Sequence, residues 1–177
     1  MTDEQLMALI QAGQLHHAGE LFMRYHLRVL NYLVGWTRDQ ILSQDVAAGT
    51  FLAIMVKCQT YNPNMPFKAW LFAIARNQRW EHQKGTILEH SPISEVPDPS
   101  PSPHDEFQEV EKLEWMSKAL NSLSNTEREI LALTKEGLSH QEIARIIGCK
   151  ESAVKDRIYR TIRRLKAKYV ALQRRGV

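Results

Sequence analysis

Hydrophobic side chains recur every three or four residues along most of the chain, a spacing typical of amphipathic α-helices. In the N-terminal half, this spacing predicts three long helices, over residues 15–36, 45–58 and 67–84. Thr2 and Gln5 have the spacing of a capping pair, so a short first helix should begin there and end near Gly13. Pro63 and Pro66 should break the chain before the last helix. No segment alternates between hydrophobic and polar residues, so we expect an all-α fold with little or no β-sheet.

The C-terminal half carries clear signals for the start and end of helices. Ser124 with Glu127, and Ser139 with Glu142, form two S-x-x-E capping boxes. The first should open a helix that ends at Gly137, and the second should open a short helix directly after it. A further helix with an acidic face is predicted upstream, over residues 105–120.

Residues 139–164 have the pattern of a helix-turn-helix. Ala144, Gly148 and Val154 supply the small contact residue, the tight turn and the buried anchor that this motif needs. A second amphipathic helix follows to about residue 172, with its hydrophobic face formed by Val154, Ile158, Ile162, Leu165 and Tyr169. The second helix of such a motif can enter the major groove of DNA and contact base edges.

A proline-rich segment divides the chain. Five of the seven prolines lie in residues 91–103, so we predict an extended or disordered linker over residues 85–104. The alternative is a surface loop held against one compact domain, although so long a loop is uncommon. The linker predicts two small helical domains, a four-helix domain over residues 1–84 and a helix-turn-helix domain over residues 105–177.

Charge is distributed unevenly between these parts. The net charge is +2 over residues 1–84, −6 over 85–123 and +7 over 124–177, where thirteen side chains are basic and six acidic. A basic end beside an acidic middle favours nucleic-acid binding by the C-terminal domain.

Other classes of protein lack support in the sequence. Cys58 and Cys149 are far apart, which argues against a disulfide scaffold or a cysteine zinc site. The seven histidines form no H-x-x-x-H or H-E-x-x-H pattern, and no phosphate-binding or serine-hydrolase motif occurs. We therefore expect no enzyme activity, metal site or cofactor. No signal peptide or membrane-spanning run is visible, so the expected location is the cytoplasm.

The order of these parts resembles the extracytoplasmic-function (ECF) group of bacterial sigma factors, the dissociable subunits that direct RNA polymerase to promoters. The resemblance is carried mainly by NPNMPFKAWLFAIARN, residues 62–77, and by the helix-turn-helix region, residues 123–158. It implies that the first domain binds core RNA polymerase and melts the −10 promoter element, that the second domain binds the −35 element, and that the linker holds them apart. The implied partners are promoter DNA and the clamp helices and flap of polymerase, without a membrane.

The resemblance assigns eight residues to the −10 element: Tyr61, Asn62, Asn64, Phe67, Lys68, Arg76, Asn77 and Trp80. A base taken out of the stack needs an aromatic wall, amide groups for its Watson–Crick edge and a cation for its phosphate, and this set offers all three. Trp70 is expected to be a core residue because it lies on the helix face of Leu71 and Ile74. Phe67 fits either the core or a base contact, and Arg76 fits either a DNA contact or a solvated face.

In the second domain, the resemblance assigns the −35 element to residues on the recognition helix: Lys155, Asp156, Tyr159, Arg160 and Arg163. Arginine and lysine can bind guanine edges or phosphates. Asp156 departs from the family, which more often has a small hydroxyl residue there. Because a carboxylate can accept a hydrogen bond from cytosine N4, we predict that Asp156 influences sequence preference.

The polymerase-binding residues implied by the resemblance are Leu33, Asp45, Val46, Thr50 and Phe51. The family pattern in this helix is rich in acids, whereas SQDVAAGTF, residues 43–51, keeps only Asp45. One interpretation is that hydrophobic contacts compensate for the lost acids. The other is a hypothesis that phosphorylation of Thr50 or Ser43 supplies negative charge and makes polymerase binding conditional.

Alternatives to the sigma-factor interpretation remain open at this stage. A stand-alone helix-turn-helix regulator would use the N-terminal helices for dimerisation or ligand binding, but it needs no base-capture loop. A partner-binding adaptor of the anti-sigma type fits the basic C-terminal domain poorly. For a sigma factor, the sequence leaves open whether an anti-sigma factor, a serine/threonine kinase or expression level controls activity.

Overall fold

The computed structural model describes residues 1–86, 118–119 and 121–173. These residues form α-helices joined by turns and contain no β-strand, which confirms the predicted all-α fold class. In chain order the elements are α1 (Asp3–Gln11), a 3-10 turn (Leu15–His17), α2 (Ala18–Thr37), α3 (Gln40–Val56), a 3-10 turn (Cys58–Thr60), α4 (Phe67–Thr86), α6 (Asn125–Lys135), α7 (His140–Ile147) and α8 (Glu151–Gln173). The predicted linker beyond residue 86, and nearly all of the helix predicted over 105–120, lie outside the described residues.

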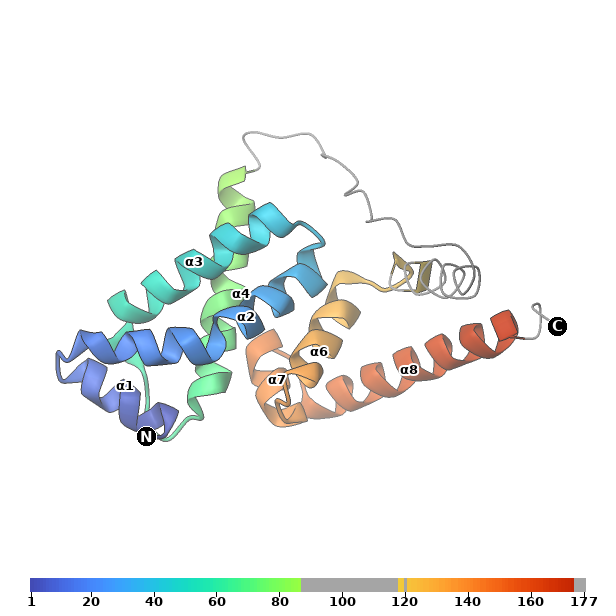
Figure 1. Cartoon of the computed structure of the whole chain (residues 1–177). Coiled ribbons are helices and arrows are strands. Elements are labelled where there is room, and N and C mark those ends of the chain that lie inside the picture. Colours follow the sequence, from blue (N-terminus) through green and yellow to red (C-terminus); the bar gives the residue numbers. More distant parts are fainter. Residues whose placement is uncertain (87–117, 120, 174–177) are drawn as a thin grey trace, which may run out of the picture.

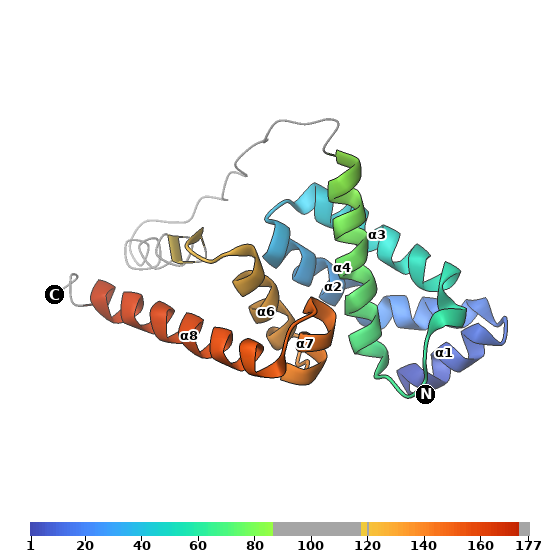
Figure 2. The ribbon, with the colours of Figure 1, turned by 180° about the vertical axis from the view of Figure 1, so that it is seen from behind.

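Helices α1–α4 form the N-terminal group, in which α2, α3 and α4 pack against one another (Figure 2). Their core is built from side chains at helical spacing, with Leu21, Val29 and Leu33 from α2 all no more than 1% exposed. Leu71 and Phe72 from α4 are fully buried against them. At the N-terminus, Thr2 and Gln5 form the predicted capping box of α1.

Two predicted helix starts differ from the structure. Residues 15–17 form a 3-10 turn instead of the first turn of α2, and their N-cap Gln14 makes no side-chain capping bond. The start predicted at residue 45 is wrong because α3 begins at Gln40. Its N-cap is Asp39, whose Oδ1 accepts a hydrogen bond from the backbone N–H of Leu42 at 2.9 Å. Asp39 therefore adds more than a turn to the N-terminus of α3.

Helices α6–α8 form the C-terminal group. Both predicted capping boxes are present, at Ser124 with Glu127 and at Ser139 with Glu142. Gly137 ends the turn after α6 with a φ of 75°, a left-handed conformation that favours glycine. Helix α8 then extends away from the rest of the molecule as a long arm toward the C-terminus (Figure 1).

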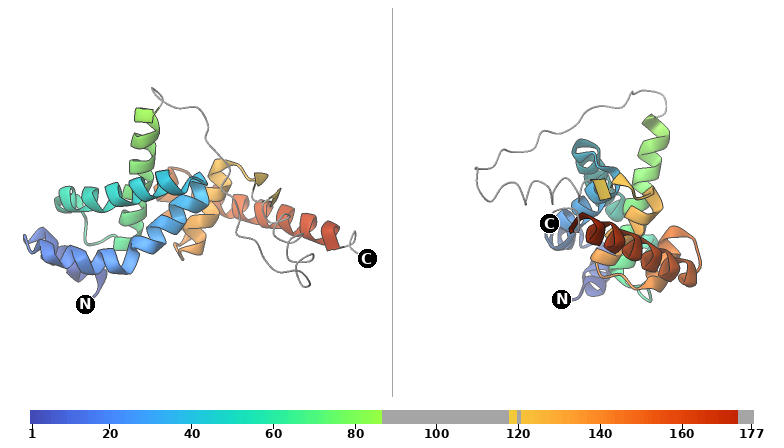
Figure 3. Two further views of the ribbon diagram at one scale, coloured as in Figure 1. Left: turned by 45° about the horizontal axis from the view of Figure 1, so that its top comes forward. Right: turned by 90° about the vertical axis from the view of Figure 1, so that its right-hand side faces the viewer.

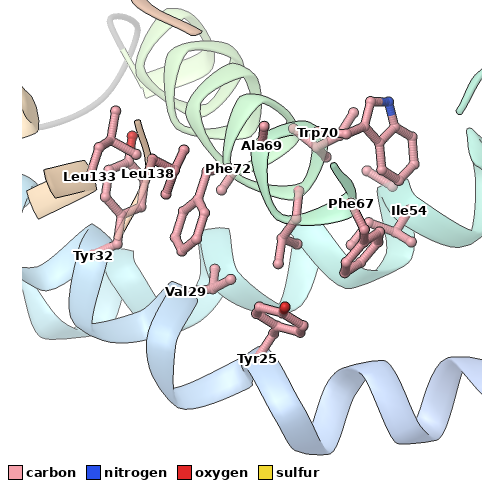
Figure 4. Close-up of a cluster of buried hydrophobic side chains, with 14 of the residues drawn as sticks. Tyr25, Val29, Tyr32, Ile54, Phe67, Ala69, Trp70, Phe72, Leu133 and Leu138 are labelled. Atoms are coloured by element: carbon pink, nitrogen blue, oxygen red, sulfur yellow. The ribbon is translucent and has the colours of Figure 1, made fainter. Parts of the chain in front are cut away.

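The two groups share one hydrophobic core. Helix α6 packs on α2, and α7 packs on α4, as the views in Figure 3 show. Leu133 from α6 and Leu138 from the following turn lie beside Tyr32 and Phe72 of the N-terminal group (Figure 4). In this structure, therefore, the C-terminal group is seated on the faces of α2 and α4.

Candidate nucleic-acid interface

Helices α7 and α8 meet with the geometry of a helix-turn-helix. The backbone N–H of Ser139 donates to the Glu142 carboxylate at 2.7 Å, which fixes the start of α7. Gly148 caps the C-terminus of α7, and its φ of 79° would strain any residue with a side chain. Ala144 and Val154 are buried where α7 and α8 pack together, at 5% and 0% exposure. The turn therefore fixes the direction in which α8 leaves the domain.

The first turns of α8 present a polar face to solvent. The residues predicted for the −35 element are all exposed: Lys155, Asp156, Tyr159, Arg160 and Arg163. Lys155 pairs with Glu151 one turn earlier at 2.7 Å, but both side chains are exposed, so the pair adds little stability. Tyr159 is 67% exposed, so its ring is accessible to a partner. The structure thus brings these five side chains together on an accessible helix surface.

Glu127 anchors α8 to α6, a role that the sequence did not reveal. Its Oε1 accepts hydrogen bonds from Thr161 at 3.1 Å and from Arg164 at 2.9 Å, both on α8. Burial would raise the pKa of Glu127, but hydrogen bonds from Ser124, Arg164 and Thr161 outweigh it and lower the pKa to about 2. The ionised carboxylate therefore holds the recognition helix in place.

Replacing Glu127 with glutamine is expected to lower the free energy of unfolding by about 1 kcal/mol at pH 7, because hydrogen bonds to a charged acceptor become neutral ones. The folded-state pKa lies below the ordinary value of 4.5, so the stabilisation is complete above that pH and is lost as pH falls toward about 2. In urea unfolding, the difference in free energy of unfolding between wild type and variant should therefore become smaller as the pH falls through this range. Glu142→Gln, the matched acid of the α7 capping box, should change stability less.

The loop before α4 differs from the predicted base-capture site. Phe67 is fully buried and packs edge-on against Tyr25, so the open choice for Phe67 is decided in favour of the core. Tyr61 is only 3% exposed, and its hydroxyl donates to the carbonyl of Met65 at 2.7 Å. The expected aromatic wall is therefore corrected for this structure, since both rings support the loop from inside. Asn62 and Asn64 remain exposed on its outer side.

Trp70 is buried, as expected from its helix face. Further along α4, the side chains of Asn77 and Trp80 are exposed. The guanidinium of Arg76 lies 5.7 Å from the centre of the Trp80 ring, which itself packs against Trp36. The accessible part of the predicted −10 surface is thus an aromatic and amide surface, while Lys68 and Arg76 are partly buried and point toward the C-terminal group.

The set predicted for polymerase binding is split between core and surface. Leu33, Val46 and Thr50 are at most 2% exposed, so their assignment as surface contacts is corrected: they hold α2 and α3 together. Asp45 is exposed, and Phe51 is partly exposed.

The phosphorylation hypothesis meets a steric obstacle. Thr50 and Ser43 are both fully buried. The Thr50 hydroxyl donates to the carbonyl of Val46 at 2.7 Å, and the Ser43 hydroxyl bonds to the carbonyl of Asp39 and the hydroxyl of Thr37. Both hydroxyls are buried and engaged, so a kinase could reach neither oxygen without local unfolding of α3.

An open hydrophobic groove of about 550 Å³ lies between α2, α3 and the turn that precedes α2. Phe22, Phe51, Leu52 and Met55 line it. Leu52 is 66% exposed and Phe22 is 43% exposed, although both lie at helical spacing from buried side chains. Periodicity marks a hydrophobic face, but it does not reveal whether another helix of the same chain covers that face.

Two other features, a metal site and a membrane-spanning helix, have requirements that the described part of the chain does not meet. No group of three or more His, Cys, Asp or Glu side chains is placed there to hold a metal ion. None of its helices is both long and hydrophobic enough to cross a membrane.

Two family models match the chain in order. The model "Sigma-70 region 2" matches residues 21–84, and "Sigma-70, region 4" matches residues 113–165. The first covers nearly all of α2–α4, and the second includes residues 139–164 of the helix-turn-helix.

Curated relatives carry the same description. The chain is 31% identical over 132 residues to the probable RNA polymerase sigma factor RfaY of Xanthomonas campestris, covering 70% of this chain and 33% of that protein. It is 28% identical over 173 residues to the ECF RNA polymerase sigma factor BldN of Streptomyces coelicolor, covering 91% and 63%. The chain thus spans about a third of the length of RfaY and under two thirds of the length of BldN.

A solved structure shows the same fold over the full length. CnrH of Cupriavidus metallidurans, in complex with the cytosolic domain of CnrY, superimposes with a TM-score of 0.70 at 24% identity. The match covers 96% of this chain and 97% of CnrH.

Proposed function

Because the chain belongs to the extracytoplasmic-function group of bacterial RNA polymerase sigma factors, we propose that it binds core RNA polymerase, recognises −35 and −10 promoter elements and starts transcription. The observation that carries this proposal is the ordered pair of region 2 and region 4 matches, with an exposed recognition helix in the second. Such a protein works in the cytoplasm beside the chromosome. It needs no catalytic residue of its own, because polymerase performs the chemistry.

We assign residues 1–84 to polymerase binding and the −10 element, residues 85–104 to the linker, and residues 105–177 to the −35 element. For −35 DNA, the exposed cations of α8 can bind phosphates and guanine edges, and Tyr159 can pack on a sugar or a thymine methyl group. Asp156 stands among these cations as the acceptor that can favour cytosine.

For −10 DNA, the exposed amides of Asn62, Asn64 and Asn77 can bond to base edges, and Trp80 can stack on an unpaired base. Lys68 and Arg76 would supply phosphate contacts once they are free. For polymerase, the outward side of α3 offers Asp45, and the hydrophobic groove beside it offers Phe51 and Leu52. Hydrophobic contact through this groove would offset the scarcity of acids in α3.

Run-off transcription with purified core polymerase on a randomised promoter library tests the proposal. We expect the chain to select promoters with two conserved elements and to bind them only together with polymerase. No initiation from any library member would overturn the proposal. Tight, selective binding without polymerase would instead identify a stand-alone helix-turn-helix regulator.

A further inference from the structure

Two glutamates of the C-terminal group hold basic side chains of the N-terminal group. Glu129 on α6 is 3% exposed, and its Oε1 accepts from the Nε of Arg76 at 2.7 Å and from the hydroxyl of Tyr32 at 3.3 Å. Glu136, directly after α6, accepts from the Nε of Arg28 through its carboxylate at 2.7 Å. Its backbone carbonyl accepts from Lys68 at 2.6 Å and from Arg28 at 3.0 Å. Four side chains of the N-terminal group are thus bound by two residues.

These polar contacts surround a hydrophobic centre, because Leu133 and Leu138 pack on Tyr32 and Phe72 between them (Figure 4). The interface also carries unfavourable terms. Burial raises the pKa of Glu129, although Arg76 opposes this shift. Keeping the Glu129 carboxylate ionised therefore costs desolvation free energy. Burial, and then the nearby Arg128, lower the pKa of Arg38, so like charges face each other across the same interface. Such a contact is suited to reversible opening.

The same contacts occupy two cations that the proposed function assigns to −10 DNA. A guanidinium that donates to Glu129, or an ammonium that donates to Glu136, cannot at the same time donate those protons to a phosphate. The two glutamates thus engage donors of Arg76 and Lys68 that a DNA phosphate would otherwise accept from. The C-terminal group does not cover the −35 residues of its own recognition helix, since all of them face solvent.

The distance between the two promoter elements also requires the two helical groups to separate before both elements are bound. Elements centred near −10 and −35 are about 25 base pairs apart, on the order of 85 Å along B-DNA at about 3.4 Å per base pair. Helix α8, the longest element described, has 23 residues and spans only about 35 Å. With the two groups packed together, one chain cannot reach both elements. The arrangement in Figures 1 and 3 therefore differs from one in which a single chain contacts both elements.

We propose that Glu129 and Glu136 form an autoinhibitory latch, in which the C-terminal group holds Arg76 and Lys68 and so blocks their contact with promoter DNA until the groups separate. This inference rests on the proposed function for the identity of the DNA. The blocked surface itself is defined by the contacts above.

Charge reversals at Arg28 and Glu136 test the latch without altering any residue assigned to DNA or polymerase. Arg28→Glu and Glu136→Arg should each open the interface by repulsion, and the double variant should close it by restoring an ion pair. Small-angle scattering of the full chain alone should show a larger radius of gyration for each single variant and the wild-type value for the double variant. Circular dichroism should show equal helix content in all four proteins.

Binding to a fluorescein-labelled single strand of twelve randomised nucleotides gives the second measurement. Each single variant should bind on the order of tenfold more tightly than wild type, and the double variant should match wild type. The two single variants change net charge in opposite directions. General electrostatics therefore predicts opposite effects on affinity, whereas the latch predicts the same effect.

Affinities that follow net charge would overturn the latch, as would expansion without a gain in affinity or no change in either measurement. The outcome is separable from the proposed function. If polymerase starts from no promoter but both single variants expand and bind the strand more tightly, the latch stands and the sigma-factor proposal fails.

Discussion

Replacing Phe72 with alanine is expected to lower the free energy of unfolding by about 3–5 kcal/mol, the usual cost of removing a fully buried aromatic ring. Phe72 is 0% exposed and packs edge-on against Tyr32 at a ring separation of 5.2 Å. Its neighbours come from both helical groups. The cavity would therefore weaken both the packing between α2 and α4 and the packing of Leu133 against them. Urea unfolding monitored by tryptophan fluorescence measures the effect.

Phe22→Ala is the matched control, because it removes the same side chain from the rim of the hydrophobic groove. Phe22 is 43% exposed, so this change should cost about 1 kcal/mol or less. Equal losses in the two variants would show that Phe72 does not lie in a packed core. A fall for Phe72→Ala confined to one of two separate unfolding transitions would show that the groups do not share that core.

The helices and their caps could be predicted from sequence because the signals are local. Each capping box needs only a hydroxyl and an acid or amide three residues apart, and the pairs at Thr2, Ser124 and Ser139 all form. The N-cap at Asp39 was not predicted because no glutamate or glutamine follows it at the third position. The preceding Arg38 also adopts a left-handed φ of 60°. Local patterns therefore located the helices better than their ends.

The side chains of the candidate site were harder to place, because burial depends on which helix packs on which face. Thr50 and Leu33 lie on helices assigned to polymerase binding, yet both faces turn into the core. Glu129 lies one turn before Leu133 on the hydrophobic side of α6, and an acid at such a position is a sequence signal for a buried polar partner. Its partner Arg76 is 53 residues away, and no local pattern specifies that pairing. The residues predicted on the recognition helix are exposed because no other described helix covers that face.

Replacing Arg160 and Arg163 together with alanine is expected to reduce initiation from −35-dependent promoters by about 100-fold or more. The two residues are three apart on α8, so their side chains share one face, and both are exposed. Each contact of an arginine with a guanine edge or phosphate contributes about 1–3 kcal/mol, and two such losses combine to this factor if they add. Run-off transcription with saturating core polymerase measures the effect.

The control removes two positive charges elsewhere, with Lys57→Ala and Lys135→Ala in one chain. If the arginines act through the −35 element, this control should retain activity within a few-fold, because general electrostatic attraction falls equally in both variants. A template with a scrambled −35 element adds a second comparison, on which wild type and the arginine variant should initiate equally weakly. Equal losses on both templates would mean that α8 contributes only non-specific attraction, and −35 recognition would then have to lie outside its first turns.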